Sequence, residues 1–142
     1  MAVSLIVAKN EKEMESIPFQ SRNYLSVGIE EKEIYDLIRD IKGYLDDIDY
    51  GCADDFLYKL EIYGEEILSK DRVENYLRLS KVLLNQKVIN YLENNNLFKN
   101  YRIYYGEEIC LKKEDYIEFA EGLKNICKVA LEENKKIFVI GE

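Results

Sequence analysis

Five aspartates within ten residues form the densest group of ionisable side chains in the sequence. Positions 46–55 read Asp-Asp-Ile-Asp-Tyr-Gly-Cys-Ala-Asp-Asp, and the carboxylates are those of Asp46, Asp47, Asp49, Asp54 and Asp55. Carboxylates at this density can pair with Arg and Lys of a partner protein, or they can hold a divalent cation. We expect this acidic segment to be a loop between two elements and the place where the protein binds its partner.

A calcium loop of the EF-hand type does not fit the acidic segment. With Asp47 and Asp49 as its first and third ligands, Gly51 falls at the fifth position, where an oxygen ligand belongs. Cys52 then falls at the sixth position, which requires glycine. We therefore predict no metal and no cofactor, and a looser magnesium site on two of the aspartates is kept as an alternative.

Side chains that could carry catalysis are few. Histidine is absent, which excludes Ser-His-Asp and Cys-His catalysis and every His-ligated metal. The sequence also lacks the glycine-rich phosphate loops and the GxSxG motif. The remaining candidates are the Glu-Glu pairs at 65–66 and 107–108 and the thiol of Cys110. Adjacent glutamates on a strand point to opposite faces, and the thiol has no evident activating group, so we predict that the protein is not an enzyme.

The negative charge of the protein is concentrated around the acidic segment. The chain has 142 residues and a net charge of -8. Positions 30–66 hold 13 acidic and four basic side chains, a balance of -9, so the rest of the chain is close to neutral. Five of the 12 tyrosines lie in the same stretch. We expect two of them, Tyr50 and Tyr58, to supply packed contacts beside the aspartates.

Hydrophobic periodicity predicts the elements that position this segment. Apolar residues recur at helical spacing in three stretches, 31–48, 70–94 and 113–133. Apolar or alternating runs indicate strands at 1–8, 23–29 and 137–140, the last of them at an internal place in a sheet. Ser69 has the side chain of an N-cap residue for the second helix, and Cys127 falls on the inner face of the third.

A five-residue repeat bears on the middle of the chain. Tyr-Gly-Glu-Glu-Ile occurs at 63–67 and again at 105–109. We interpret each copy as part of a β-hairpin that leads into a helix, which gives two hairpin-then-helix units at about 55–94 and 101–133. The alternative makes 53–68 a helix, because its apolar residues also fit helical spacing. The predicted fold is α+β, with a mixed or antiparallel sheet of about six or seven strands and three main helices, in a single domain over 1–142.

The composition also bears on location and on partners. No stretch reaches the length of a membrane-spanning helix, and the apolar run at the start lacks the basic residues of a signal peptide. Three widely spaced cysteines fit a reducing compartment, so we predict a cytoplasmic protein. The acidic balance argues against direct binding to nucleic acid.

These features predict a small acidic binding protein of the inhibitor or immunity type, an antitoxin. It would neutralise a basic partner protein, such as a nuclease toxin, by occluding the partner's positively charged cleft. A phage- or defence-related decoy that imitates nucleic-acid charge predicts the same surface with another partner. A structural or oligomeric domain with a merely solvated acidic face, and a magnesium-dependent enzyme, are the alternatives from other classes.

Overall fold

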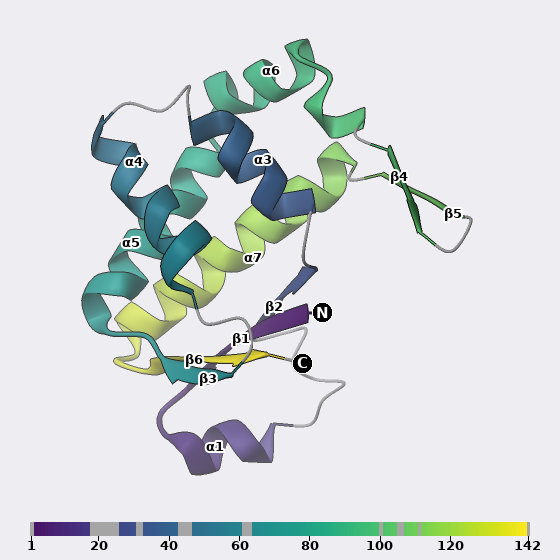
Figure 1. Ribbon diagram of the computed structural model, residues 1–142. Coiled ribbons are helices and arrows are strands. Elements are labelled where there is room, and N and C mark those ends of the chain that lie inside the picture. Colours follow the sequence, from purple (N-terminus) through teal and green to yellow (C-terminus); the bar gives the residue numbers. More distant parts are fainter. Residues whose placement is uncertain are drawn as a thin grey trace.

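The computed structural model describes residues 2–17, 26–30, 33–42, 47–60, 64–99, 101–104, 107–110 and 112–141. Its centre is an antiparallel sheet of four strands in the order β2-β1-β6-β3 (Figure 1). The four strands are β1 Ala2–Ala8, β2 Ser26–Glu30, β3 Glu65–Ile67 and β6 Lys136–Gly141. A separate antiparallel pair, β4 Tyr101–Tyr104 and β5 Glu107–Cys110, projects from the body of the molecule (Figure 1).

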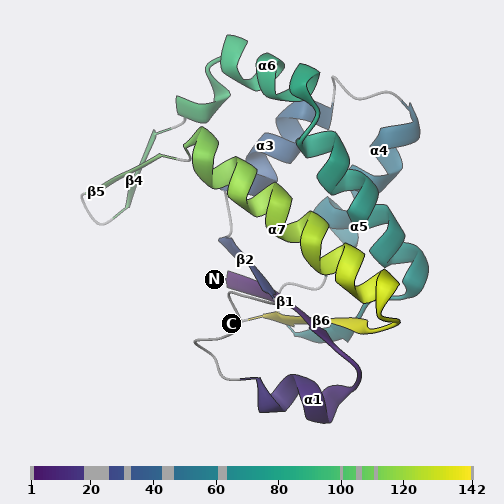
Figure 2. The same ribbon diagram turned by 180° about the vertical axis from the view of Figure 1, so that it is seen from behind.

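Six α-helices lie in the described part of the chain: α1 Glu11–Ser16, α3 Glu33–Lys42, α4 Asp47–Asp54, α5 Lys70–Leu83, α6 Gln86–Asn94 and α7 Lys113–Glu132. A π-helical turn, Asp55–Lys59, continues α4, and a 3-10 turn, Leu97–Lys99, follows α6. Helices α3 to α7 cover one face of the sheet, and α1 lies alone on the other face (Figures 1 and 2). None of these helices combines the length and the apolar character needed to cross a membrane.

The two central strands, β1 and β6, are apolar on both faces because both faces are covered. On the helical face, β1 and β6 contribute buried side chains to the main core: Val3, Leu5, Val7, Ile137 and Val139. On the other face, Ile6, Ala8 and Phe138 pack with Met14 of α1 in a smaller cluster. Along β1 and β6, successive side chains therefore point into the two cores in turn.

The structure confirms the predicted α+β class and several of its elements. Strand β1 lies where the first apolar run predicted it, and β6 is internal, between β1 and β3. Helix α7 begins at Lys113, as predicted, and ends at Glu132. The hydroxyl of Ser69 caps α5 by accepting a hydrogen bond from the backbone N–H of Arg72 at 3.3 Å.

The predicted sheet of six or seven strands is wrong, since no sheet in the described residues has more than four. The second hairpin-then-helix unit exists as β4, β5 and α7. The first does not, because positions 55–59 are helical and β3 pairs with β6 instead of with a neighbouring hairpin strand. Cys52, Ala53 and Phe56 are all buried, so the helical period of this segment determines its structure.

Both of the first two predicted helices are interrupted. The helix predicted over 31–48 ends as α3 at Lys42, and α4 begins at Asp47. The helix predicted over 70–94 is two helices, because the side chain of Asn85 accepts a hydrogen bond from the backbone N–H of Lys87 at 2.9 Å and caps α6. A good capping residue inside an apolar stripe therefore marks a helix start.

Candidate functional site

The acidic segment is helical over most of its length, and the predicted loop is wrong there. Asp47, Asp49 and Tyr50 lie in α4, although the structure does not describe their side chains, and Asp54 ends this helix. Asp46 lies outside the described residues.

One side of this helical segment is buried and the other faces solvent. The side chains of Cys52 and Phe56 lie in the main core, whereas Gly51 is exposed and Asp54 is half-buried. Tyr58 in the π turn is 64% exposed. Positions 47, 51, 54 and 58 follow one another at helical spacing, and we call this stripe the Tyr58 face.

Asp55 does not belong to that face. It is 5% exposed, so its predicted role as a partner-binding residue on a loop is not supported by its position. The hydroxyl of Tyr76 in α5 donates a hydrogen bond of 2.8 Å to Oδ1 of Asp55. A buried carboxylate needs hydrogen-bond donors, and the other donor to Asp55 is the guanidinium of Arg72.

Arg72, near the start of α5, binds four groups with one guanidinium. Its Nε donates to both carboxylate oxygens of Asp55, at 3.1 and 3.3 Å. Its Nη1 donates to Oε2 of Glu66 in β3 at 2.8 Å. Its Nη2 donates to the backbone carbonyl of Lys59 at 3.2 Å and to the hydroxyl of Tyr76 at 3.1 Å. These five residues form the Arg72 cluster.

The Arg72 cluster holds the π turn at both ends. Asp55 is the first residue of the turn and Lys59 is the last, so one guanidinium fixes the start and the finish of the segment that carries Tyr58. Its bond to Glu66 ties the same turn to the edge of the sheet. The planar fork of Arg can make these bonds together, which a lysine ammonium cannot do with the same geometry.

The surroundings of Arg72 and Tyr76 raise the pKa of both side chains. Partial burial of the guanidinium by itself lowers its pKa, but the hydrogen bonds to Glu66 and then to Asp55 raise the pKa of Arg72 above its ordinary value. Burial, followed by the hydrogen bond to Asp55, raises the pKa of Tyr76. Arg72 is therefore charged and Tyr76 neutral at every pH at which proteins are usually handled.

Aromatic packing holds the same turn on its core side. The ring of Phe56 meets that of Tyr76 edge to face, with centroids 5.8 Å apart, and that of Phe119 in α7 at 6.1 Å. Such edge-to-face pairs add to the stabilisation that burial alone provides. The turn is thus fixed by polar bonds on one side and by the core on the other.

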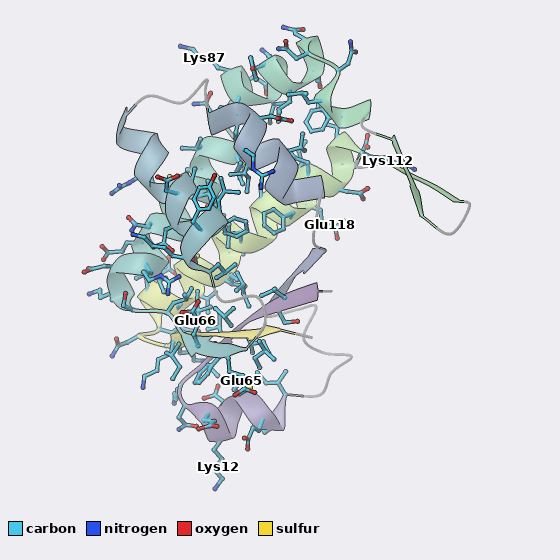
Figure 3. The ribbon with its side chains drawn as sticks, viewed as in Figure 1. Lys12, Glu65, Glu66, Lys87, Lys112 and Glu118 are labelled. Atoms are coloured by element: carbon cyan, nitrogen blue, oxygen red, sulfur yellow. The ribbon has the colours of Figure 1, made fainter. Side chains whose placement is uncertain are left out.

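The structure describes the side chains of two of the three cysteines and of one of the two Glu-Glu pairs. Cys52 and Cys127 are buried free cysteines, and burial raises the pKa of Cys127 to about 12. Glu65 and Glu66 occupy opposite faces of β3, as expected for neighbours on a strand (Figure 3). Within the described part of the chain, no three acidic or cysteine side chains come together in a way that could hold a metal ion.

Reasoning from the sequence missed the Arg72 cluster. Tyr76 lies within the stretch 70–94 that has helical spacing, but nothing in the sequence indicates a partner for its hydroxyl. Arg72 precedes Tyr76 by four residues, a spacing that places both on one side of α5. The sequence signal for the cluster is therefore a basic residue one helical turn before a tyrosine in an apolar stripe. The acidic partner of Arg72, Asp55, lies 17 positions earlier in the chain.

No protein-family model, no curated protein and no solved structure matches this chain. What the Tyr58 face can bind therefore has to follow from its own chemistry. An exposed tyrosine on a fixed turn, within the most acidic part of the chain, is suited to a positively charged protein surface.

Proposed function

We propose that the protein is an inhibitor of the immunity type, which binds a basic partner protein through the Tyr58 face and blocks the partner's positively charged cleft. A nuclease toxin is a partner of this kind, since its cleft must hold phosphates. In this proposal Asp47 and Asp54, which belong to that face, pair with Arg and Lys of the cleft, and Asp46 and Asp49 add to the negative charge at the start of the same segment. Tyr58 and Tyr50 are the packed anchors at the centre of the contact.

The observation that carries the proposal is the fixed presentation of Tyr58. This side chain is 64% exposed, yet the turn that bears it is bonded to Arg72 at its first and last residues. A tyrosine on a turn fixed in this way loses little backbone freedom on binding, so more of its contact energy appears as affinity. Large exposed apolar side chains are otherwise rare here, with Ile67 as the second one among the described residues.

The carboxylates and the tyrosine have different tasks. Carboxylates near the rim of an interface attract a basic partner over several ångströms and speed association, an effect that salt weakens. A buried aromatic side chain at the centre mainly slows dissociation. The two contributions can therefore be separated by kinetics.

The test begins with the tagged protein and a lysate of its native source at low salt. A partner eluted by rising salt and identified by mass spectrometry is purified for binding kinetics and for a nuclease assay. A variant with Asp46, Asp47, Asp49 and Asp54 changed to Asn should associate at least about tenfold more slowly at low salt. Tyr58→Ala should instead raise the dissociation rate about tenfold or more.

A matched control removes the same four charges elsewhere. Glu114, Asp115, Glu118 and Glu121 are exposed on α7, and their amide variants change the net charge equally. If the control slows association as much as the acidic-segment variant, only net charge matters and the Tyr58 face is not the interface. An eluted partner without nuclease activity that binds DNA would favour the decoy, and unchanged binding in every variant would overturn the proposal.

A further inference from the structure

A groove lies on the other side of the sheet, between α1 and the edge strand β3. It has a volume of about 210 Å³. Its apolar lining comes from Met14, Ile67, Phe138 and Ile140, and the carboxylates of Glu11 and Glu65 border it. We call it the edge groove. Figure 3 shows Glu65 on the α1 side of β3, facing away from the helical layer that Glu66 faces.

The backbone of β3 has an open hydrogen-bonding edge beside this groove. Gly141 N–H donates to the carbonyl of Gly64, and Leu68 N–H donates to that of Ile137, both at 2.9 Å. In an antiparallel ladder, residues that bond to the neighbouring strand alternate with residues that do not. Positions 64, 66 and 68 therefore face β6, and the N–H and C=O groups of Glu65 and Ile67 point outward. No described residue bonds to them there.

The side chains at these positions add recognition to the open edge. Ile67 is 52% exposed although it borders an apolar groove. Natural sheets usually protect an edge strand with charge, with brevity or with a covering element. Strand β3 is short, but an isoleucine at its outward-bonding position offers an apolar contact to a chain that pairs there.

The negative charge around the groove favours a positively charged ligand. The carboxylates that border it are those of Glu11 and Glu65, and no basic residue lines it. Glu66 is bonded to Arg72, whereas in the described part of the chain neither Glu11 nor Glu65 has an ion-pair partner. A segment with Lys or Arg opposite Glu65 would gain an ion pair across the two strands.

We propose that β3 is a docking edge for an extended basic segment of a partner protein, which adds to the sheet as a fifth strand. The outward backbone groups of Glu65 and Ile67 supply the main-chain bonds. The edge groove receives an apolar side chain beside Ile67, and Glu65 pairs with a basic one. The inference does not depend on the proposed function, because it uses the opposite face of the sheet and a different mode of binding.

The probe is a short synthetic peptide in which Thr alternates with Lys and Ile, labelled with a fluorophore, and binding is measured by anisotropy with the full chain. Ile67→Pro is the decisive variant. It removes an N–H that points away from β6, so the native ladder keeps its bonds, and proline is tolerated at such edge positions. We expect Ile67→Pro to keep its melting temperature within a few degrees and to bind the peptide at least about tenfold more weakly.

Two further variants complete the design. Ile67→Val keeps both the N–H and an apolar side chain, so it should bind the peptide like the parent protein. Glu65→Gln should weaken the Lys-containing peptide about threefold and leave a peptide of Thr and Ile alone unchanged.

Three outcomes would overturn the proposal. One is a lack of peptide binding at millimolar concentration, and another is undiminished binding by a folded Ile67→Pro variant. The third is a dimer of the parent chain in sedimentation that Ile67→Pro dissociates, because the occupant of the edge is then a second copy of this chain.

Discussion

At the scale of single residues, the Arg72 cluster explains why Asp55, one of the five aspartates of the acidic segment, lies inside the molecule. Its carboxylate accepts bonds from Arg72 and Tyr76, so burial leaves it with partners. Asp54, its neighbour in sequence, is half-buried on the Tyr58 face. Adjacent identical residues therefore have different tasks, one internal and one proposed for binding.

Arg72→Met should lower the free energy of unfolding by about 3 kcal/mol, because it leaves the buried carboxylate of Asp55 without its counter-charge. Arg72→Lys should lower the free energy of unfolding by a smaller amount, since an ammonium keeps the counter-charge but cannot bind all four groups. Urea unfolding followed by circular dichroism measures both losses. Arg78→Met is the control, an exposed arginine of the same helix, expected within about 0.5 kcal/mol of the parent. Equal stabilities of the Arg72 and Arg78 variants would show that the cluster contributes nothing.

At the scale of elements, the sequence predicted helices and strands best where one period is long and unopposed. Helix α7 is 20 residues long and has buried residues at helical spacing from Tyr116 to Ala130, and the predicted start of this helix is confirmed. The segment 53–68 carries both periods, since Phe56, Tyr58 and Leu60 alternate along a strand, while Ala53 and Phe56 would lie on one side of a helix. The two periods are distinguished only by which side chains are buried in the folded protein. Cys52, Ala53 and Phe56 are buried together, which is the helical pattern.

The site was predictable to a smaller extent than the fold. Local charge identified the acidic segment, but it could not distinguish Asp55 from its neighbours, because that distinction depends on Arg72 17 positions later. Helix α1 was missed for a related reason. Met14 is its single buried residue, so it has almost no apolar stripe to reveal it.

The break between α5 and α6 depends on the Asn85 cap. Asn85→Ala removes the acceptor for the Lys87 N–H and should lower the free energy of unfolding by about 1 kcal/mol. Chemical denaturation measures this, with Asn125→Ala on an exposed position of α7 as the control. An Asn85→Ala variant as stable as the control would mean that the break is set by packing alone.

At the scale of the whole molecule, buried ionisable groups make stability depend on alkaline pH. Burial raises the pKa of Cys127 from 9.0 to about 12, and burial raises the pKa values of Tyr76 and Tyr116 as well. In the unfolded chain these groups ionise near their ordinary values, whereas in the folded protein they remain protonated. Above about pH 9 the unfolded state therefore binds fewer protons, and the free energy of unfolding falls as pH rises.

We expect this free energy to be level between about pH 7 and 8 and to fall by about 1 kcal/mol between pH 9 and 10 on account of Cys127. Urea unfolding at each pH measures the change. Cys127→Ala is less stable overall because of the cavity, but its pH slope over that interval should be smaller by the same amount. An unchanged slope in Cys127→Ala would show that this thiol ionises equally in both states.

The sheet order has a consequence for how the protein assembles during synthesis. Strand β6 separates β1 from β3 and leaves the ribosome after every other described element. Until it arrives, the β1–β2 ribbon has one unfilled side and β3 has no neighbour, so closure of the sheet joins parts of the chain that are very distant in sequence and is slow. The π turn and Arg72 are near neighbours along the chain and can meet early. The edge groove, in contrast, is lined by Phe138 and Ile140 of β6. During synthesis the Tyr58 face can therefore form before the edge groove exists.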